Sequence, residues 1–266
     1  MIKKLLILSL LLLSVLGCNN GALKPDDFSR KTIDKKYPHW RVGISRFEID
    51  SRMDKYTVIK INEKRYVLRC MALIRTAVNS PEFLNNVRAN KASLLSSVND
   101  TYNGHSIKEG DPYDPDRLVE CIRSLEYDFV YTKMNTGGCT GELGKSRYLR
   151  YGLQNNKEIP TGKWTGFSSG NWDSGAPLYG DYSWPYASWA SLMFHEHMHN
   201  IGFNHVGGRD VPTTLQNILY EIMKRILYGD LKNKYYQELE ELTAYYYSEY
   251  KYLLTSDSIF DPSDKQ

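Results

Sequence analysis

Apolar residues recur every three or four positions in several stretches of the chain, which is the spacing of an amphipathic helix. This pattern predicts helices over residues 65–78, from residue 81 to about residue 95, and from Pro115 onward. Ser80 and Asp114, each followed directly by proline, are residue types that commonly begin helices. The first half of the chain is therefore predicted to contain at least three helices.

Shorter stretches are rich in aromatic and β-branched residues and predict strands. They cover residues 40–49, 56–61, 127–131 and 146–151. Gly, Asn and Asp are frequent over residues 99–112, which predicts a loop. Helical and strand-forming stretches are intermixed, so the predicted fold class is α+β.

The second half of the chain is predicted to be mainly helical. Helices are expected over residues 183–200, 214–228 and 231–254, followed by a frayed polar end at 256–266. A stretch rich in Gly, Ser, Trp and Tyr, residues 164–184, precedes the first of these helices. Long loops of this kind are often functional, so it is expected either to shape a substrate cleft or only to cover the core.

The N-terminus has the pattern of an export signal. Residues 1–17 combine two early lysines with an apolar run too short to span a bilayer comfortably. The run ends in Val15-Leu16-Gly17-Cys18, which resembles a bacterial lipobox and implies that Cys18 is lipidated; the alternative is an ordinary secreted protein cut nearby. Residues 18–38 then read as the lipidated cysteine and a polar tether. Asn19 after the cysteine favours an outer-membrane location.

Charge and cysteine content narrow the function classes. The formal net charge is +3 and falls to +1 without Lys3 and Lys4, which gives no basis for nucleic-acid binding.

Export places the remaining cysteines in an oxidising compartment, so they form either one disulfide with one thiol left over or separate buried thiols. These cysteines are Cys70, Cys121 and Cys139.

The densest group of chemically active residues lies at 195–205, with the pattern H-E-x-x-H-x-x-G-x-x-H. In a helix, His195 and His199 lie one turn apart on the same face and can share one zinc ion. Gly202 tolerates the left-handed backbone that commonly ends a helix, so the chain can turn there. After that turn, His205 can return as a third ligand.

Three nitrogen ligands leave one tetrahedral position open, which is typical of catalytic zinc rather than of a closed structural site. Zinc lowers the pKa of a bound water to about 7, and Glu196 is placed to take its proton and pass it to a leaving amine. The predicted reaction is hydrolysis of an amide bond. His197 lies two residues from either helical ligand and is expected to point away from the metal.

The eleven-residue motif resembles the zinc-binding signature of the metzincin metallopeptidases. The resemblance implies His195, His199 and His205 as zinc ligands and Glu196 as general base. It also implies a mixed sheet above an active-site helix, which divides the chain into an N-terminal subdomain, 39–202, and a mainly helical C-terminal subdomain, 203–266.

Metzincins also place a methionine in a tight turn beneath the zinc. Met223 is the one methionine downstream of His205, but apolar residues around it recur at helical spacing and favour a packed helix over a turn. Tyr220 is a candidate to stabilise the oxyanion, with core packing as the alternative.

These observations predict a lipid-anchored, zinc-dependent endopeptidase that acts on a protein or peptide outside the cytoplasm. Two alternatives share the same residues. One is a binding lipoprotein with a metallopeptidase-like fold and no activity, and the other is a zinc amidase acting on a non-protein amide.

Overall fold

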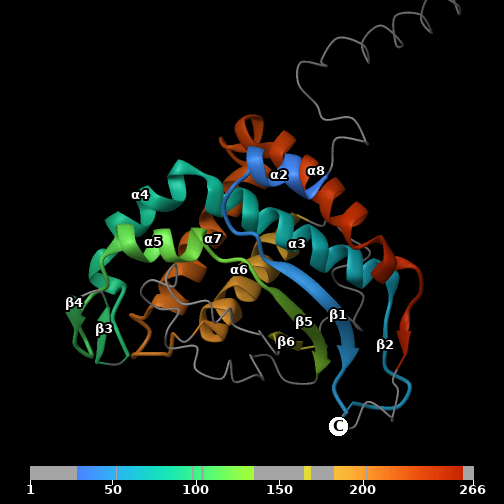
Figure 1. Ribbon diagram of the computed structural model, residues 1–266, viewed down its shortest axis with the longest axis horizontal. Helices are drawn as coiled ribbons and strands as arrows, with labels where there is room; N and C mark the ends of the chain where they lie inside the picture. The colour runs from blue at the N-terminus through green and yellow to red at the C-terminus, as the bar shows by residue number, and fades with distance from the viewer. Residues whose placement is uncertain are drawn as a thin grey trace, which may run out of the picture.

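A computed structural model describes residues 29–51, 53–97, 99–102, 105–134, 165–168, 183–201 and 203–259. These residues form helices and small sheets, which confirms the predicted α+β class (Figure 1). The helices are α2 (Arg30–Lys36), α3 (Ile61–Asn79), α4 (Pro81–Ala89), α5 (Pro115–Arg123), α6 (Ser183–Asn200), α7 (Val211–Tyr228) and α8 (Lys232–Glu249), with 3₁₀ turns η2 (Lys91–Ser93) and η5 (Lys251–Leu254).

The largest described sheet has the strand order β1-β5-β6. Its strands are β1 (Gly43–Ile49), β5 (Asp128–Met134) and β6 (Thr165–Ser168), and both pairings are parallel. The strands predicted over 40–49 and 127–131 are confirmed, whereas β6 lies in a segment predicted to be a loop. The implied mixed sheet stays a prediction, because 135–164 and 169–182 lie outside the described residues, and so does the strand predicted at 146–151.

Helices α3 and α6 lie beside this sheet, with α3 crossing above its strands in Figure 1. Phe129, Tyr131 and Lys133 alternate along β5 and therefore share one face of the sheet. Tyr131 and Lys133 reach Glu63 of α3, where the tyrosine hydroxyl donates over 3.1 Å and the lysine Nζ over 3.2 Å. Phe129 packs against α6, so both helices are held by the same face of the strand.

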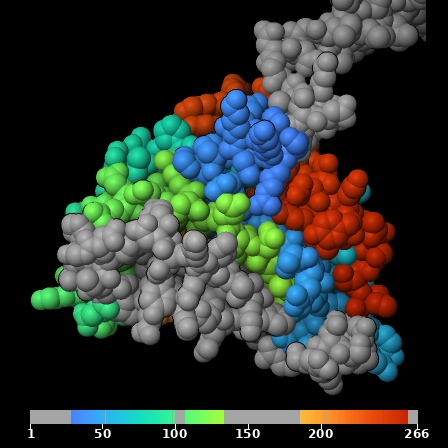
Figure 2. Space-filling view, in the orientation of Figure 1, coloured from blue at the N-terminus to red at the C-terminus, as the bar shows by residue number. Residues whose placement is uncertain are grey.

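The segment 29–38 is part of the folded structure, which corrects its prediction as a tether. Ser29 caps α2 through the N–H of Thr32, and the side chains of Ile33 and Tyr37 are buried. The Tyr37 hydroxyl donates to Glu241 of α8 over 2.6 Å. Figure 2 shows the N-terminal residues of this region, in blue, next to the C-terminal residues, in red. Burial of two side chains among 29–38 favours docking on α8 over a solvated tether.

Several predicted boundaries are corrected by the structure. Helix α4 ends at Ala89 and not near residue 95, because the chain turns through η2. The predicted loop at 99–112 contains the hairpin of β3 (Asp100–Tyr102) and β4 (His105–Ile107). The predicted helix 231–254 is α-helical only to Glu249.

The predicted frayed end is partly wrong as well. β7 (Ser258–Ile259) pairs antiparallel with β2 (Val58–Ile59), which lies within the strand predicted at 56–61. This pairing joins segments that lie far apart in the sequence, so no local pattern could have indicated it.

The helix starts agree well with the sequence. Ser80 accepts the N–H of Phe83 at the start of α4, and Asp114 accepts that of Arg117 at the start of α5, which confirms both predicted caps. Helix α6 begins at Ser183, as predicted. Helix α7 begins three residues earlier than predicted, because Asp210 caps it.

Cys70 and Cys121 are both buried, and no disulfide joins them to each other. Cys18 and Cys139 lie outside the described residues. Among the residues that the structure describes, no helix is both long and apolar enough to span a bilayer. One hydrophobic cluster includes residues on both sides of position 202, so the predicted boundary between subdomains does not divide the core.

Glu238 of α8 makes the stability of this helix layer sensitive to pH. Its Oε1 is buried and has no hydrogen-bond partner among the described residues. Burial and the nearby Glu241 raise the pKa of Glu238 from 4.5 to about 7, although Arg75 and Lys36 act in the opposite direction. The folded state therefore holds this proton more tightly than the unfolded chain, and the resulting stability is lost as pH rises from about 4.5 through about 7.

We expect Glu238→Gln, which is neutral at every pH, to remove this dependence. Its free energy of unfolding should exceed that of the parent by about 1–2 kcal/mol at pH 8, with little or no such gain at pH 4. Urea denaturation at both pH values measures the difference. Glu249→Gln, an exposed change on the same helix, is the control. Equal pH profiles for parent and Glu238→Gln would contradict the assignment.

Candidate metal centre

Helix α6 carries the first two histidines of the motif and ends just after them. His195 and His199 lie one turn apart, as their spacing predicts. Two backbone hydrogen bonds close the end of the helix. The N–H of Ile201 donates to the carbonyl of His197 over 3.1 Å, and the N–H of Phe203 donates to the carbonyl of Met198 over 3.0 Å. The chain leaves the helix there, and His205 follows in the connection to α7. Gly202, predicted to form this turn, lies outside the described residues.

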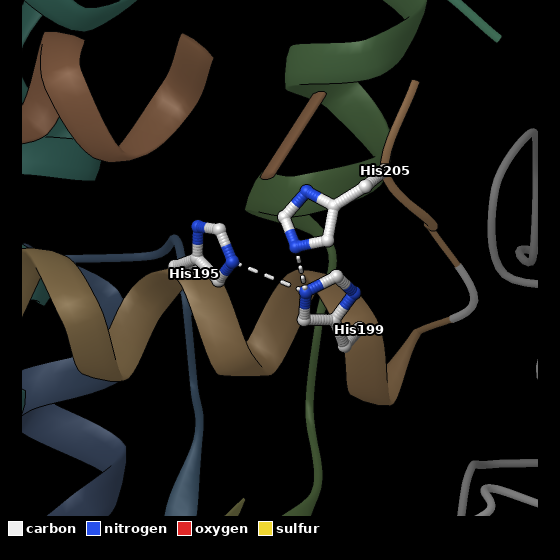
Figure 3. A group of neighbouring side chains, drawn as sticks. All are labelled: His195, His199 and His205. Carbon is white, nitrogen blue, oxygen red and sulfur yellow. Dashed lines mark hydrogen bonds between the residues drawn. The ribbon is translucent and has the colours of Figure 1, made fainter. Parts of the chain in front are cut away.

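The three imidazole rings converge on one point (Figure 3). Nε2 of His199 lies 3.1 Å from Nε2 of His195 and 3.1 Å from Nε2 of His205. One ligand atom from each ring lies within 4.8 Å of those of the other two. The structure thus brings together the three residues that the motif predicted as ligands, and they could hold a metal ion.

The partners of the other ring nitrogens determine where the protons lie. Nδ1 of His199 is 2.7 Å from the carbonyl of Phe203, and a carbonyl can only accept, so this nitrogen carries the proton. Nδ1 of His205 is 3.2 Å from Oδ2 of Asp210, a carboxylate that accepts in the same way. In the neutral rings, Nε2 of both residues therefore presents a lone pair.

The Nε2 atoms of His199 and His205 lie 3.1 Å apart, and an ion placed between two such nitrogen lone pairs would be coordinated by both. Two zinc–nitrogen bonds of about 2.0–2.1 Å at a tetrahedral angle separate their nitrogens by about 3.3 Å. The observed separation fits that value, so the donor set and its spacing suit a divalent ion such as zinc.

Burial keeps two of the rings in the neutral form that metals bind. It lowers the pKa of His195 to about 4, with His199 and His205 acting in the same direction, and Asp210 and the Pro212 backbone opposing them. Burial also lowers the pKa of His199, and the electrostatic interaction with His205 lowers it further. Both rings are therefore uncharged at neutral pH, as ligation requires.

The site is open on one side. His195 is 8% exposed, whereas the side chain of His205 is 55% exposed. Glu196, the predicted general base, is buried next to His195 on α6. Its predicted catalytic role stays a prediction. A group bound by the three rings would be reached from solvent on the side of His205.

His197 lies on the opposite side of α6 and packs in the core, in agreement with its predicted direction. Its ring is fully buried and makes edge contacts with Phe129 at 4.7 Å and Trp40 at 5.4 Å between centroids. Nδ1 is hydrogen-bonded to the Tyr127 hydroxyl. Burial lowers the pKa of His197 to about 3, so it is an uncharged core residue.

Trp40 shows how firmly this side of α6 is held. Its φ is 58°, in the left-handed region that bulky residues rarely adopt, at a cost of about 1–3 kcal/mol. The indole is buried and packs on both Phe194 and His197, with a centroid separation of 4.9 Å to Phe194. Packing against α6 offsets this backbone strain.

The sequence did not reveal two partners of the candidate ligands, the Phe203 carbonyl and the Asp210 carboxylate. Every residue has a backbone carbonyl, so a sequence motif cannot indicate which carbonyl binds a ligand side chain. Asp210 could have been identified as the cap of α7 from the Asp-x-Pro pattern with Pro212, but that signal says nothing about His205.

The two further predicted site residues lie in α7. Met223 is fully buried within this helix, which confirms the predicted packed helix and shows that Met223 is not in a tight turn. Tyr220 packs against the core, and Nζ of Lys224 lies 5.0 Å from its ring centroid. Its role at an oxyanion stays a prediction. Of the predicted cleft loop at 164–184, residues 164 and 169–182 lie outside the described residues.

Comparison of the chain with protein-family models, with curated proteins and with solved structures found no match.

We expect His197→Ala to destabilise the fold without affecting metal binding. Removing a fully buried ring leaves a cavity and should cost about 2–4 kcal/mol of unfolding free energy. The metal content per chain should equal that of the parent, because the ring lies on the core side of α6. Chemical denaturation and elemental analysis of metal-loaded protein measure the two effects, with His39→Ala as the control. Loss of metal from folded His197→Ala would show that this histidine is a ligand.

Proposed function

We propose that this chain is a zinc-dependent endopeptidase with a metzincin-like fold. The observation that carries the proposal is the convergence of Nε2 of His195, His199 and His205 within coordination distance, directly beside Glu196. Three protein nitrogens leave a position for water or substrate, which distinguishes catalytic from closed structural zinc sites.

Zinc, when bound, supplies a Lewis acid that lowers the pKa of a coordinated water to about 7. Nε2 of His195, His199 and His205 would hold the ion. Glu196 takes the proton of the attacking water and returns it to the leaving amine, so one carboxylate serves as base and then as acid. The exposed side of His205 gives an extended peptide access to the site.

Glu196→Gln tests this mechanism because it keeps the size of the side chain and removes its basicity. We expect zinc content to stay equal to that of the parent while the cleavage rate falls roughly 10²–10⁴-fold. His199→Ala should lose both zinc and activity. Glu221→Gln, at an exposed position of α7, is the matched control and should behave like the parent.

A quenched-fluorescence peptide library measures cleavage, and elemental analysis measures zinc. If zinc-loaded Glu196→Gln cleaves as fast as the parent, the mechanism is wrong. A zinc-loaded parent that cleaves no peptide supports one of the two alternatives. Hydrolysis of non-peptide amides would then indicate an amidase, and inertness toward them would indicate a binding protein.

We further propose that the protein is exported and anchored by a lipid on Cys18 to a bacterial membrane, with an outer-membrane location favoured by Asn19. The support is the lysine-led apolar run that ends at Gly17-Cys18.

In a bacterial host, the intact mass of the membrane-bound parent should exceed that of residues 18–266 by the mass of attached lipid. Cys18→Ser should lose this added mass and move to the soluble fraction, because the change removes the thiol that carries the lipid. Recovery of the parent in the soluble fraction, at the mass of an unmodified chain, would instead indicate an ordinary secreted protein.

A further inference from the structure

The Asp210 side chain connects the third histidine to the start of helix α7. It is fully buried, and each of its oxygens serves a different element. Oδ1 accepts the N–H of Thr213 over 2.9 Å and so caps α7. Oδ2 accepts the N–H of Val206 over 2.9 Å and lies 3.2 Å from Nδ1 of His205. One carboxylate thus fixes the helix start and the ligand ring together.

His205 has little else to hold it. More than half of its side chain is exposed, so packing contributes little to its position. The following Gly207 and Gly208 have φ of 59° and 79°, conformations that suit glycine and form a tight return of the chain. The N–H of Arg209 donates to the carbonyl of Val206 over 3.3 Å and closes this turn. The Asp210 carboxylate is therefore the buried group that orients an otherwise exposed ligand.

Asp210 is itself anchored from the opposite direction. The N–H of Leu95 donates to the carbonyl of Arg209 over 3.1 Å, and Leu95 forms a parallel bridge with Asp210. The Thr214 hydroxyl donates to the carbonyl of Ser93 over 2.7 Å. The start of α7 is thus tied to the connection that follows α4. The carboxylate faces His205 from a fixed part of the fold and not from a free loop.

The end of helix α6 and the start of helix α7 both contribute to the histidine cluster. His195 and His199 come from α6, whereas His205 lies in the connection and contacts Asp210, the cap of α7. The geometry of the three rings depends on how the start of α7 is seated against the end of α6.

We propose that Asp210 is a positioning residue that couples metal binding to the order of the segment 203–214. This inference rests on the proposed function, because it assumes that the three histidines bind zinc. An ion held by His205 restrains the ring, the ring restrains Asp210, and Asp210 restrains the first turn of α7. In the other direction, a seated α7 holds Nε2 of His205 toward the other two rings. Groups that bond the second nitrogen of a ligating histidine typically change metal affinity 10–100-fold.

Two substitutions separate this role from simple helix capping. Asp210→Ser keeps a good capping oxygen but is too short to reach His205. Asp210→Asn keeps the size and an oxygen acceptor but removes the negative charge that favours the ligating imidazole. Asp114→Ser is the matched control, because the Asp114 side chain likewise accepts a backbone N–H three residues later, and both α5 and α7 have proline in their first turn. Circular dichroism verifies that each variant is folded.

Zinc affinity is measured on the purified full-length protein by competition with a chromophoric chelator. We expect Asp210→Ser to bind zinc 10–100-fold more weakly than the parent, Asp210→Asn to lie between them, and Asp114→Ser to equal the parent. Cobalt(II) substitution gives a second readout, since a displaced His205 changes the visible absorption of the bound ion. Hydrogen exchange gives a third, because zinc should slow amide exchange over 203–214 in the parent and much less in Asp210→Ser.

The outcomes distinguish this inference from the proposed function. If the parent binds zinc and folded Asp210→Ser binds it equally tightly with an unchanged cobalt spectrum, the coupling through Asp210 is wrong and the zinc site stands. If Asp210→Ser does not fold, equal affinity and spectrum of parent and Asp210→Asn overturn the inference. A folded parent that binds no zinc overturns the proposed function and the inference with it.

Discussion

The candidate metal centre depends on how helix α6 is fixed about its own axis. Phe194 and His197, three residues apart, lie on the side that packs against Trp40. His195 and His199, four residues apart, lie on the side that meets His205. Because both pairs belong to the same two turns, the packing of one pair sets the direction of the other. Metal coordination requires ligand placement within about 0.5 Å, which a loosely packed helix would not provide.

Aromatic packing on the core side supplies this rigidity at a local cost. Trp40 adopts a strained backbone conformation, and His197 is buried where a charged imidazole would be strongly disfavoured. Both features go against local preferences, and such departures tend to occur where a structure holds a functional site. The tightly packed ring of Phe129 links the helix to the sheet, so the position of α6 follows that of β5.

The three histidines differ in how they are held, and this difference matters for assembly of the site. Two rings come from a buried helix and are neutral because of their burial. The third comes from an exposed turn and depends on a buried carboxylate. The three rings already converge in the folded chain, so the arrangement that could hold a metal ion is preorganised.

The sequence alone determined the features that arise from local geometry. The 3.6-residue repeat determined α3, α5 and α7 to within a few residues, proline and capping residues marked helix starts, and the spacing of His195 and His199 determined that they share a face. It also identified His205 as the third member of the cluster, because the motif encodes the turn that returns it.

Tertiary structure decided the contacts between positions whose partners no local pattern specifies. The docking of α2 on α8, the pairing of β2 with β7, and the aromatic surroundings of His197 join segments distant in sequence. Even the contact between His205 and Asp210, only five residues apart, forms in an irregular turn, where sequence spacing does not predict the direction of a side chain. Periodicity and capping act within a few residues, whereas the choice of a distant partner depends on the packing of the whole chain.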